Sequence, residues 1–453
     1  MANTFSIVHG STTVNLHSGN IIVMKYSPTI GRGETVLDEV VLYLTGTATN
    51  IQTSIRSIGR ALELAERRYD TGRGDRVYFK VQVDGTDALY RSEIVRESPY
   101  KSAGELRLPN RESLGIEWTG KGLRCTLLLT RVNHFEADAE AELALTNPGG
   151  SGTGGQTVYN FYDTGLGAIQ DYVTIAAAAI GGDMPAACRI EMTNSDAGDA
   201  LETVWIGQNV LSDPANLTYY LEISASDTGA NVGDATCSAG FKRSYDITTT
   251  EAKVTGWTLA SANLVDFNGG YFKAMIRFSS GADVTEVKWR IKVLYSGTVI
   301  YEGGQVQFDD TYTAIARVVR ELDTVQLPPY VPENSAPTDL TFELWGQSAS
   351  GSTETILIDC IVLLALDGYR RLRSLEGIVQ NAILKDDSIT GTYYQEVSAK
   401  QVRDIATNGS QIMLWPNEIN RLYFKLHSIT ANTGEVDRTI SVRIYYRPRR
   451  ITL

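Results

Sequence analysis

Cysteine and histidine are scarce in this chain, and those present lack the spacing of a metal or disulfide site. The 453 residues include four cysteines, Cys125, Cys188, Cys237 and Cys360. They are far apart and form no C-x-x-C pair, which predicts isolated buried or semi-buried thiols rather than a disulfide framework. The four histidines are His9, His17, His134 and His427. None of them has H-x-x-x-H spacing, so we expect no metal site.

Long apolar runs are also missing. No apolar run reaches the roughly 18 residues that a membrane-spanning helix needs, so we expect no membrane span. The first ten residues, MANTFSIVHG, contain no basic start followed by an apolar stretch. The sequence therefore predicts no secretion signal.

An excess of positive charge is the third absence. The chain carries 41 lysines and arginines against 53 aspartates and glutamates, a net charge of −12. A general nucleic-acid-binding surface should be basic, so this balance argues against one. An acidic surface would instead allow DNA to pass nearby without being held.

The motifs of common enzymes are missing as well. The sequence has no G-x-S-x-G nucleophile elbow, no P-loop and no G-x-G-x-x-G turn. A glycosidase needs two opposed carboxylates in a cleft, and the sequence alone does not pair its many carboxylates. We therefore expect a protein that is not an enzyme, with no catalytic residues and no cofactor.

One strongly periodic helix is predicted over residues 51–69. Its apolar positions recur at alternating steps of four and three residues, which places them on one stripe; they are Ile51, Ile55, Ile58, Leu62, Ala65 and Tyr69. Thr49 with Gln52 fits a capping box, and Asn50 is an alternative cap. Gly72 and Gly74 then end the helix. We expect it to cover the apolar face of a sheet.

Most of the remaining chain is predicted to be strand, so the expected fold class is mainly β. Residues 1–147 should form an antiparallel sheet domain with the packing helix. Residues 148–157, PGGSGTGGQT, have the composition of a flexible linker. About ten strands in 158–367 predict one two-sheet sandwich, a jelly roll. Residues 368–453 form a C-terminal β segment with strands at 421–426 and 439–446.

Strand alternation also assigns the tryptophans to faces. Trp289 and Trp118 align with apolar neighbours and are predicted to lie in the core. Trp205, Trp257 and Trp345 alternate with Thr, Lys or Glu instead, which places them on a polar face of the sandwich. An exposed aromatic ring on a sheet is a usual platform for a sugar ring, so these three are candidate carbohydrate-binding residues. The alternative is that they cover a loop or a subunit interface.

Both ends of the sequence carry a family resemblance. The N-terminal part, ending in Leu127-Leu128-Leu129-Thr130-Arg131-Val132-Asn133-His134-Phe135, resembles the ring domain of bacteriophage tail proteins. The stretches 414–424, LWPNEINRLYF, and 442–450, VRIYYRPRR, resemble the closing strands of distal tail proteins. Asn417 stands where that family usually has glycine, and there is one extra residue before Asn420. The stretches 182–185, GDMP, and 358–364, IDCIVLL, are similar to jelly-roll modules inserted into larger tail proteins.

The resemblance implies a structural role in a virion tail assembled in the cytoplasm of a host bacterium. Distal tail proteins form a homo-oligomeric ring, commonly a hexamer, between the tail tube and the tail tip, and DNA passes through it without specific binding. Inserted jelly rolls project outward and are candidates for binding host surface glycans. Two alternatives stay open: a tail-tube or other ring-forming virion protein whose sandwich is only decoration, and a polysaccharide-degrading tail enzyme.

Overall fold

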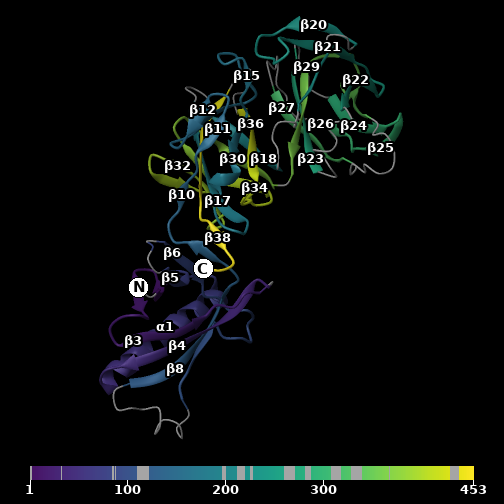
Figure 1. Ribbon diagram of the computed structural model, residues 1–453. Helices are drawn as coiled ribbons and strands as arrows, with labels where there is room; N and C mark the ends of the chain where they lie inside the picture. The colour runs from purple at the N-terminus through teal and green to yellow at the C-terminus, as the bar shows by residue number, and fades with distance from the viewer. Residues whose placement is uncertain are drawn as a thin grey trace. The chain divides into compact units, whose positions relative to one another are not determined.

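The computed structural model is mainly β, as the alternating sequence pattern predicts (Figure 1). It describes residues 3–31, 33–83, 86, 88–109, 122–195, 200–211, 220–224, 228–259, 271–280, 287–307, 318–327, 339–366, 368–428 and 438–453. The predicted core residue Trp118 lies outside these residues. Within the described part, one α-helix is present, and no helix is both long and apolar enough to cross a membrane. All four cysteines are free and buried, as their isolation in the sequence predicts.

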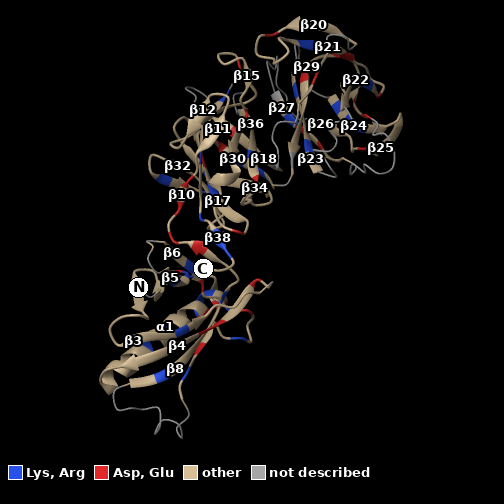
Figure 2. Ribbon diagram, viewed as in Figure 1, with Lys and Arg blue, Asp and Glu red and all other residues tan. Residues whose placement is uncertain are grey.

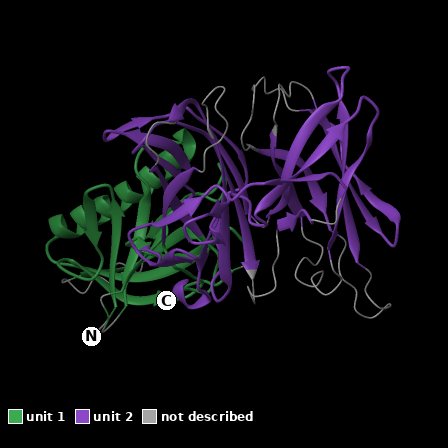
Figure 3. Ribbon diagram, turned by 90° about the horizontal axis from the view of Figure 1, so that it is seen from above, with its two compact units in different colours: residues 1–141, 181–186, 447–453 green, residues 142–180, 187–446 purple. Residues whose placement is uncertain are grey.

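The chain forms two compact units, coloured separately in Figure 3. Unit 1 comprises residues 1–141, 181–186 and 447–453, and unit 2 comprises 142–180 and 187–446. Unit 1 therefore takes both ends of the chain. The expected boundaries at 147 and 367 do not coincide with this division.

Unit 1 is built from two antiparallel sheets. The first has the order β2-β1-β5-β6-β9-β38, with bounds β1 Thr4–His9, β2 Thr12–Asn15, β5 Val77–Gln82, β6 Leu89–Glu93, β9 Phe135–Ala137 and β38 Arg449–Arg450. The second has the order β3-β4-β8-β7, with bounds β3 Ile21–Ser27, β4 Thr35–Thr45, β7 Gly104–Arg107 and β8 Gly122–Val132. One apolar core joins both sheets, because inward side chains such as Phe79, Val40 and Leu127 are fully buried in one cluster.

The helix α1 spans Ala48–Thr71 and buries the predicted stripe against this core. Its N-cap is Thr47, whose hydroxyl accepts from the Asn50 backbone N–H, two residues earlier than the expected cap. Gly72 ends the helix in the left-handed conformation at φ 64°, as predicted. Tyr69, at the end of the predicted stripe, is 45% exposed instead.

A buried ion pair lies inside unit 1. Arg131 on β8 and Asp38 on β4 are both fully buried, with Nε 2.5 Å from Oδ2. Asp38 also accepts from the Tyr26 hydroxyl at 2.7 Å and from the Thr29 backbone N–H at 2.7 Å. The Arg131 guanidinium lies over the ring of Phe135, 4.2 Å from its centroid. These contacts satisfy charges that would be costly to bury alone.

Unit 2 contains two jelly rolls, one inserted into the other. The host jelly roll has eight core strands: β13 Gln156–Tyr159, β16 Tyr172–Ile175, β17 Ala186–Asn194, β18 Leu201–Leu211, β30 Gly368–Ile378, β31 Ile383–Asp387, β36 Ile419–Ser428 and β37 Thr439–Tyr446. Numbered 1 to 8 in chain order, they form one sheet of order 1-8-3-6 and another of order 2-7-4-5. That exchange of strands between two antiparallel sheets is the jelly-roll arrangement.

The inserted jelly roll repeats the same topology between β18 and β30. Its core strands are β21 Phe241–Ile247, β22 Ala252–Leu259, β23 Tyr271–Ser280, β24 Val287–Tyr295, β25 Thr298–Glu302, β27 Val318–Gln326, β28 Leu340–Ser348 and β29 Glu354–Ala365. They form the sheets β21-β29-β23-β27 and β22-β28-β24-β25, again 1-8-3-6 and 2-7-4-5. In β24 the residues Val287, Trp289, Ile291 and Val293 are all buried, as alternation predicts.

The remaining strands of unit 2 are short; β14 and β15 pair with each other, and the others extend the sheets of the two jelly rolls. They are β10 Ala141–Glu142, β11 Leu145–Asn147, β12 Gly150–Gly152, β14 Tyr162–Asp163, β15 Ala168–Ile169, β19 Tyr220–Glu222, β20 Ala230–Gly233, β26 Val306–Gln307, β32 Thr392–Val397, β33 Lys400–Val402, β34 Ile405–Gly409 and β35 Met413–Leu414.

Two features correct the expected organisation. The glycine-rich segment 148–157 is part of the host jelly roll, because β12 pairs with β11 and β13 pairs with β37. The segment 158–367 is not one sandwich, because its first strands pair with β30, β31, β36 and β37 from beyond residue 367. Local composition and alternation carry no information on such distant partners, which is why the sequence did not reveal the nesting.

Asn417 occupies a left-handed position in its turn. It adopts φ 62°, a left-handed conformation that glycine takes freely and asparagine tolerates better than most residues. The Asn420 side chain then holds the turn, accepting from the Trp415 N–H and donating to the Trp415 and Glu418 carbonyls.

The nested topology predicts which fragments of unit 2 fold. A fragment of residues 212–367 contains all eight core strands of the inserted jelly roll and should give a cooperative melt by circular dichroism. A fragment of residues 158–367 adds β16, β17 and β18 without their partner strands, and should aggregate or stay partly unfolded. A soluble, cooperatively folded 158–367 fragment beside an unfolded 212–367 fragment would contradict the nesting.

Candidate functional site

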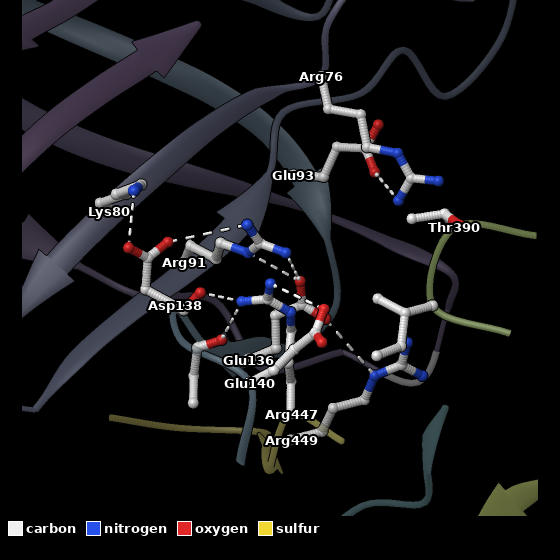
Figure 4. A network of polar contacts seen from close by, with 12 residues as sticks. Arg76, Lys80, Arg91, Glu93, Glu136, Asp138, Glu140, Thr390, Arg447 and Arg449 are labelled. Atoms are coloured by element: carbon white, nitrogen blue, oxygen red, sulfur yellow. Dashed lines mark hydrogen bonds and ion pairs between the residues drawn. The ribbon is translucent and has the colours of Figure 1, made fainter. Parts of the chain in front are cut away.

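The C-terminal R-P-R segment, 447–449, is tied into unit 1 by a network of charged side chains (Figure 4). Arg447 donates to the Ala137 carbonyl at 3.2 Å and to the Asp138 carbonyl, and it lies 3.3 Å from a Glu140 carboxylate oxygen. The Ala137 N–H donates to the Pro448 carbonyl at 3.0 Å. The end of the chain thereby becomes the sixth strand, β38, of the first sheet.

The carboxylates of this network are shared with the neighbouring strands. Lys80 on β5 contacts Asp138 at 2.8 Å, and Arg91 on β6 contacts Glu136 at 2.8 Å. All four of these side chains are less than one quarter exposed. We call Lys80, Arg91, Glu136, Asp138, Glu140 and Arg447 the terminal clamp. Its three cations are matched by three carboxylates, so the arrangement is suited to fixing the C-terminal segment in unit 1 rather than to holding a ligand.

Gly182 brings a distant segment against the same strand. A side chain at this position would place its Cβ 2.2 Å from the Arg449 carbonyl oxygen, and its φ is 101°. The next residue, Asp183, donates its N–H to the Arg449 carbonyl at 2.9 Å and accepts from the Ile451 N–H at 2.8 Å. The GDMP stretch, expected in the jelly roll, therefore belongs to unit 1.

His134 lies beside this strand and is neutral at ordinary pH. Burial lowers the pKa of His134 to about 4, and the positive charges of Arg449 and Arg131 act in the same direction. A neutral, half-buried imidazole is compatible with a structural role.

The four-stranded sheet of unit 1 has two unpaired edges. Within the described residues, β3 pairs only with β4, and β7 pairs only with β8. Because β3, β4, β8 and β7 are antiparallel in turn, β3 and β7 run in opposite directions. A second copy could therefore place its β7 beside β3 and continue the antiparallel pattern.

Apolar side chains are exposed beside these edges. Ile22 and Met24 on β3 are 42% and 62% exposed, and Leu37 on β4 is 53% exposed. Near β7, a groove of about 430 Å3 is lined by Leu37, Leu128 and Thr130 among others, with charged residues also lining it. The charged lining residues are Glu97, Lys101, Glu105 and Arg107. Sequence reasoning missed this surface, although the unbroken apolar run at 21–24 is a signal, since it puts apolar residues on both faces of a strand.

The three candidate carbohydrate-binding tryptophans are not brought together on one open face. Trp205 pairs with Lys425 and Arg371 in register, so it lies on the polar face of the host sheet, as alternation predicts. It is nevertheless only 4% exposed, because it packs in one cluster with the core of the inserted jelly roll. The expectation that Trp205 is accessible to solvent is therefore wrong.

Trp257 is buried for a different reason. The pairing of β22 with β28 shifts between Lys253 and Thr255, which is a β-bulge. One extra residue reverses the alternation, so Lys253 faces solvent while Thr255 and Trp257 face the core, at 4% and 7% exposure. A bulge leaves no mark on composition, and the sequence analysis therefore assigned Trp257 to the wrong face.

Trp345 lies on the solvent face of β28, and it is half-buried. Its neighbours across the sheet are Lys253 and Arg290. The indole Nε1 donates to Glu343 at 3.0 Å, and the Lys292 ammonium lies 4.1 Å from the ring centroid. Of the three tryptophans, Trp345 alone remains a candidate platform, and a sugar stacking on it would compete with Lys292.

Charges of both signs are spread over both units (Figure 2). Among the described residues, no group of three or more His, Cys, Asp or Glu side chains could hold a metal ion.

Comparisons with known proteins give only distant likenesses. No protein-family model matches the sequence, and no curated protein matches it. A structure of the phage P2 baseplate in its activated conformation with calcium is similar at 7% identity and TM-score 0.27, covering 99% of this chain and 98% of that one. An arabinose-bound α-L-arabinofuranosidase matches at 14% identity and TM-score 0.22, over 50% of this chain and 32% of that one. Infectious bursal disease virus, Gt strain, matches at 9% identity and TM-score 0.18, over 69% and 83%. TM-scores this low carry no conclusion about function.

The terminal clamp predicts a cost for removing its central arginine. The change Arg447→Met keeps the length of the side chain but removes the bonds to the two carbonyls and to Glu140. Hydrogen bonds of this kind contribute about 1–3 kcal/mol, so unit 1 should lose about 2 kcal/mol in urea unfolding. The matched control is Arg107→Met, which removes an exposed pair with Glu105 and should cost less than about 1 kcal/mol. Equal losses of unfolding free energy in the two variants would mean that the terminal clamp does not stabilise unit 1.

Alanine substitutions of the three tryptophans should differ in how much stability they cost. Trp205→Ala and Trp257→Ala each empty a buried site and should cost about 3–5 kcal/mol. Trp345→Ala removes a half-buried ring with one cation–π contact, and should cost about 1 kcal/mol. Thermal melts of the three variants measure the difference. A loss at Trp345 as large as at Trp257 would show that Trp345 is a structural residue.

Proposed function

We propose that this protein is a structural component of a bacteriophage tail, a distal tail or baseplate ring protein that joins the tail tube to the tip. Several copies of unit 1 form a ring around the path of the DNA. Unit 2 is an accessory module carried by that ring. The virion assembles in the cytoplasm of the host bacterium, and the partners are other copies of this chain and neighbouring tail proteins.

The observation that carries the proposal is the construction of unit 1. It contains both chain ends and residues 181–186, and its strands β9 and β38, on either side of the long insertion, pair with each other. Its four-stranded sheet leaves β3 and β7 unpaired among the described residues, and the two strands run in opposite directions. Such edges invite pairing with another chain unless something blocks them. A contact between two different edges is heterologous, and a heterologous contact generates a ring when its rotation closes.

The charge of the chain supports this role. A net charge of −12 disfavours tight binding to phosphates, since affinity for DNA comes largely from lysine and arginine contacts. A ring through which DNA passes needs a surface that does not bind phosphates tightly.

A glycan-binding role for the inserted jelly roll is a second candidate, and the position of Trp345 on a solvent face is what favours it. Lys292 over the ring and the burial of Trp205 and Trp257 favour the alternative, a purely decorative sandwich. Trp345→Ala should keep the fold, so the wild type and this variant can be compared directly on a glycan array. Identical glycan-binding patterns for the two proteins would favour a purely decorative sandwich. Nothing among the described residues favours the polysaccharide-degrading alternative.

Charged residues placed on the free β3 edge should abolish assembly. We expect Ile22→Asp combined with Met24→Asp to convert the ring to monomers, because two carboxylates would have to be buried in the new contact. Both positions are exposed in the single chain, so monomer stability should change by less than about 0.5 kcal/mol. Size-exclusion chromatography with light scattering and negative-stain electron microscopy measure the assembly.

The control is Leu375→Asp, at a 73% exposed position on β30 of the host jelly roll. This variant should assemble as the wild type does. Rings formed equally well by the β3 double variant would rule out assembly through this edge. A wild-type protein that is monomeric at all concentrations would contradict the ring itself.

A further inference from the structure

The outer face of one host sheet is covered by the inserted jelly roll. Three side chains that face outward from β18 and β36, Trp205, Tyr423 and Lys425, are at most 4% exposed. Trp205 and Tyr423 belong to the same apolar cluster as the core of the inserted jelly roll, together with Phe161 of the host. The two jelly rolls are therefore docked through this sheet face.

The first polar contact across the docking face is centred on Asp171. This host carboxylate accepts from the hydroxyl of Tyr220, on β19 of the insert, and is paired with Lys425 on host strand β36. Asp171 and Lys425 are both fully buried. The Lys425 ammonium also lies 5.0 Å from the Phe161 ring and 5.3 Å from the Tyr220 ring.

Three further contacts across the face also involve charged side chains. Glu321 on β27 of the insert accepts from the hydroxyl of host Tyr369 and lies 3.5 Å from host Arg371. Arg320, next to it on β27, lies 3.0 Å from His427 Nδ1 of the host.

The composition of the docking face lowers the free-energy cost of separating the two jelly rolls. Apolar contact from the host comes from a small set of mostly aromatic side chains, and the contacts that bridge the two bodies involve carboxylates, guanidinium groups and tyrosine hydroxyls. When the bodies part, water hydrates these charges, whereas an apolar interface has no such compensation. Polar interfaces between domains of one chain commonly permit relative motion. Each jelly roll also has its own two sheets and can stay folded when undocked.

We propose that the docking face is a reversible latch, from which the inserted jelly roll separates as a folded body while remaining attached between β18 and β30. The closed state is the one seen here, held by the Tyr220–Asp171 and Tyr369–Glu321 bonds. The open state releases the insert to sample other positions. This inference does not depend on the function proposed above.

The test is single-molecule energy transfer in the full chain between dyes on the two bodies. The four native cysteines are buried, so cysteines added at Leu375 on the host and Val299 on the insert can be labelled selectively. We expect the wild type to show one main distance and a minor second one that grows with sodium chloride, as the partly exposed Glu321–Arg371 pair becomes screened.

Tyr220→Phe and Tyr369→Phe each remove a hydroxyl group and with it one hydrogen bond across the docking face. Each should raise the open-to-closed ratio about tenfold, the factor that a hydrogen bond to a charged acceptor commonly represents. Tyr301→Phe is the matched control, because its hydroxyl donates to Asp323 at 3.0 Å within the insert. It should leave the ratio unchanged.

The outcomes are distinct. A second distance that grows in Tyr220→Phe and Tyr369→Phe but not in Tyr301→Phe supports the latch. A single unchanged distance in all variants and at all salt concentrations overturns it. The latch is also overturned if both jelly rolls unfold in a single cooperative transition and no second dye-to-dye distance is seen at lower temperature. The two bodies would then be one folding unit.

Discussion

The architecture depends on one constraint: each insertion joins two strands that are antiparallel neighbours. In unit 1 the chain leaves after residue 141, contributes residues 181–186 on the way, and finally returns as β38, which pairs with β9. In the host jelly roll it leaves after β18 and returns as β30, which pairs with β18. Each insert therefore takes the place of a hairpin loop. Its entry and exit points are already adjacent, and the entropy of closing the connection grows only slowly with its length.

The jelly-roll topology makes repeated insertion possible. Its first and last strands are neighbours, as β13 and β37 show in the host. A module with adjacent ends can be placed in a loop without distorting the sheets that carry it, and its own core stays complete. Unit 1 therefore keeps the free sheet edges on which the proposed ring depends. The host jelly roll of unit 2 likewise stays intact while it carries a second module.

Buried charge has two different roles in this molecule. In unit 1 the Arg131–Asp38 pair lies within a single core, where the partners come from neighbouring strands of one sheet and cannot separate without local unfolding. At the face between the jelly rolls the tyrosine–carboxylate bonds join separate bodies. The chemistry is similar, but a pair inside one core fixes a fold, whereas a pair between two cores can be broken while both folds persist.

The sequence by itself determined the local structure: the helix with its glycine stop, the alternating strands such as β24, the mainly β class and the isolated thiols. These follow from periodicity and residue type, which act over a few residues. The tertiary structure alone decided which strands pair, and hence that 148–157 is strand rather than linker and that there are two jelly rolls rather than one. It also decided the fate of the tryptophans, since a bulge at 253–255 turned Trp257 inward and a second jelly roll covered Trp205. Alternation assigns a side chain to a face of a strand, but burial depends on what is packed against that face, and this comes from residues far away in the chain.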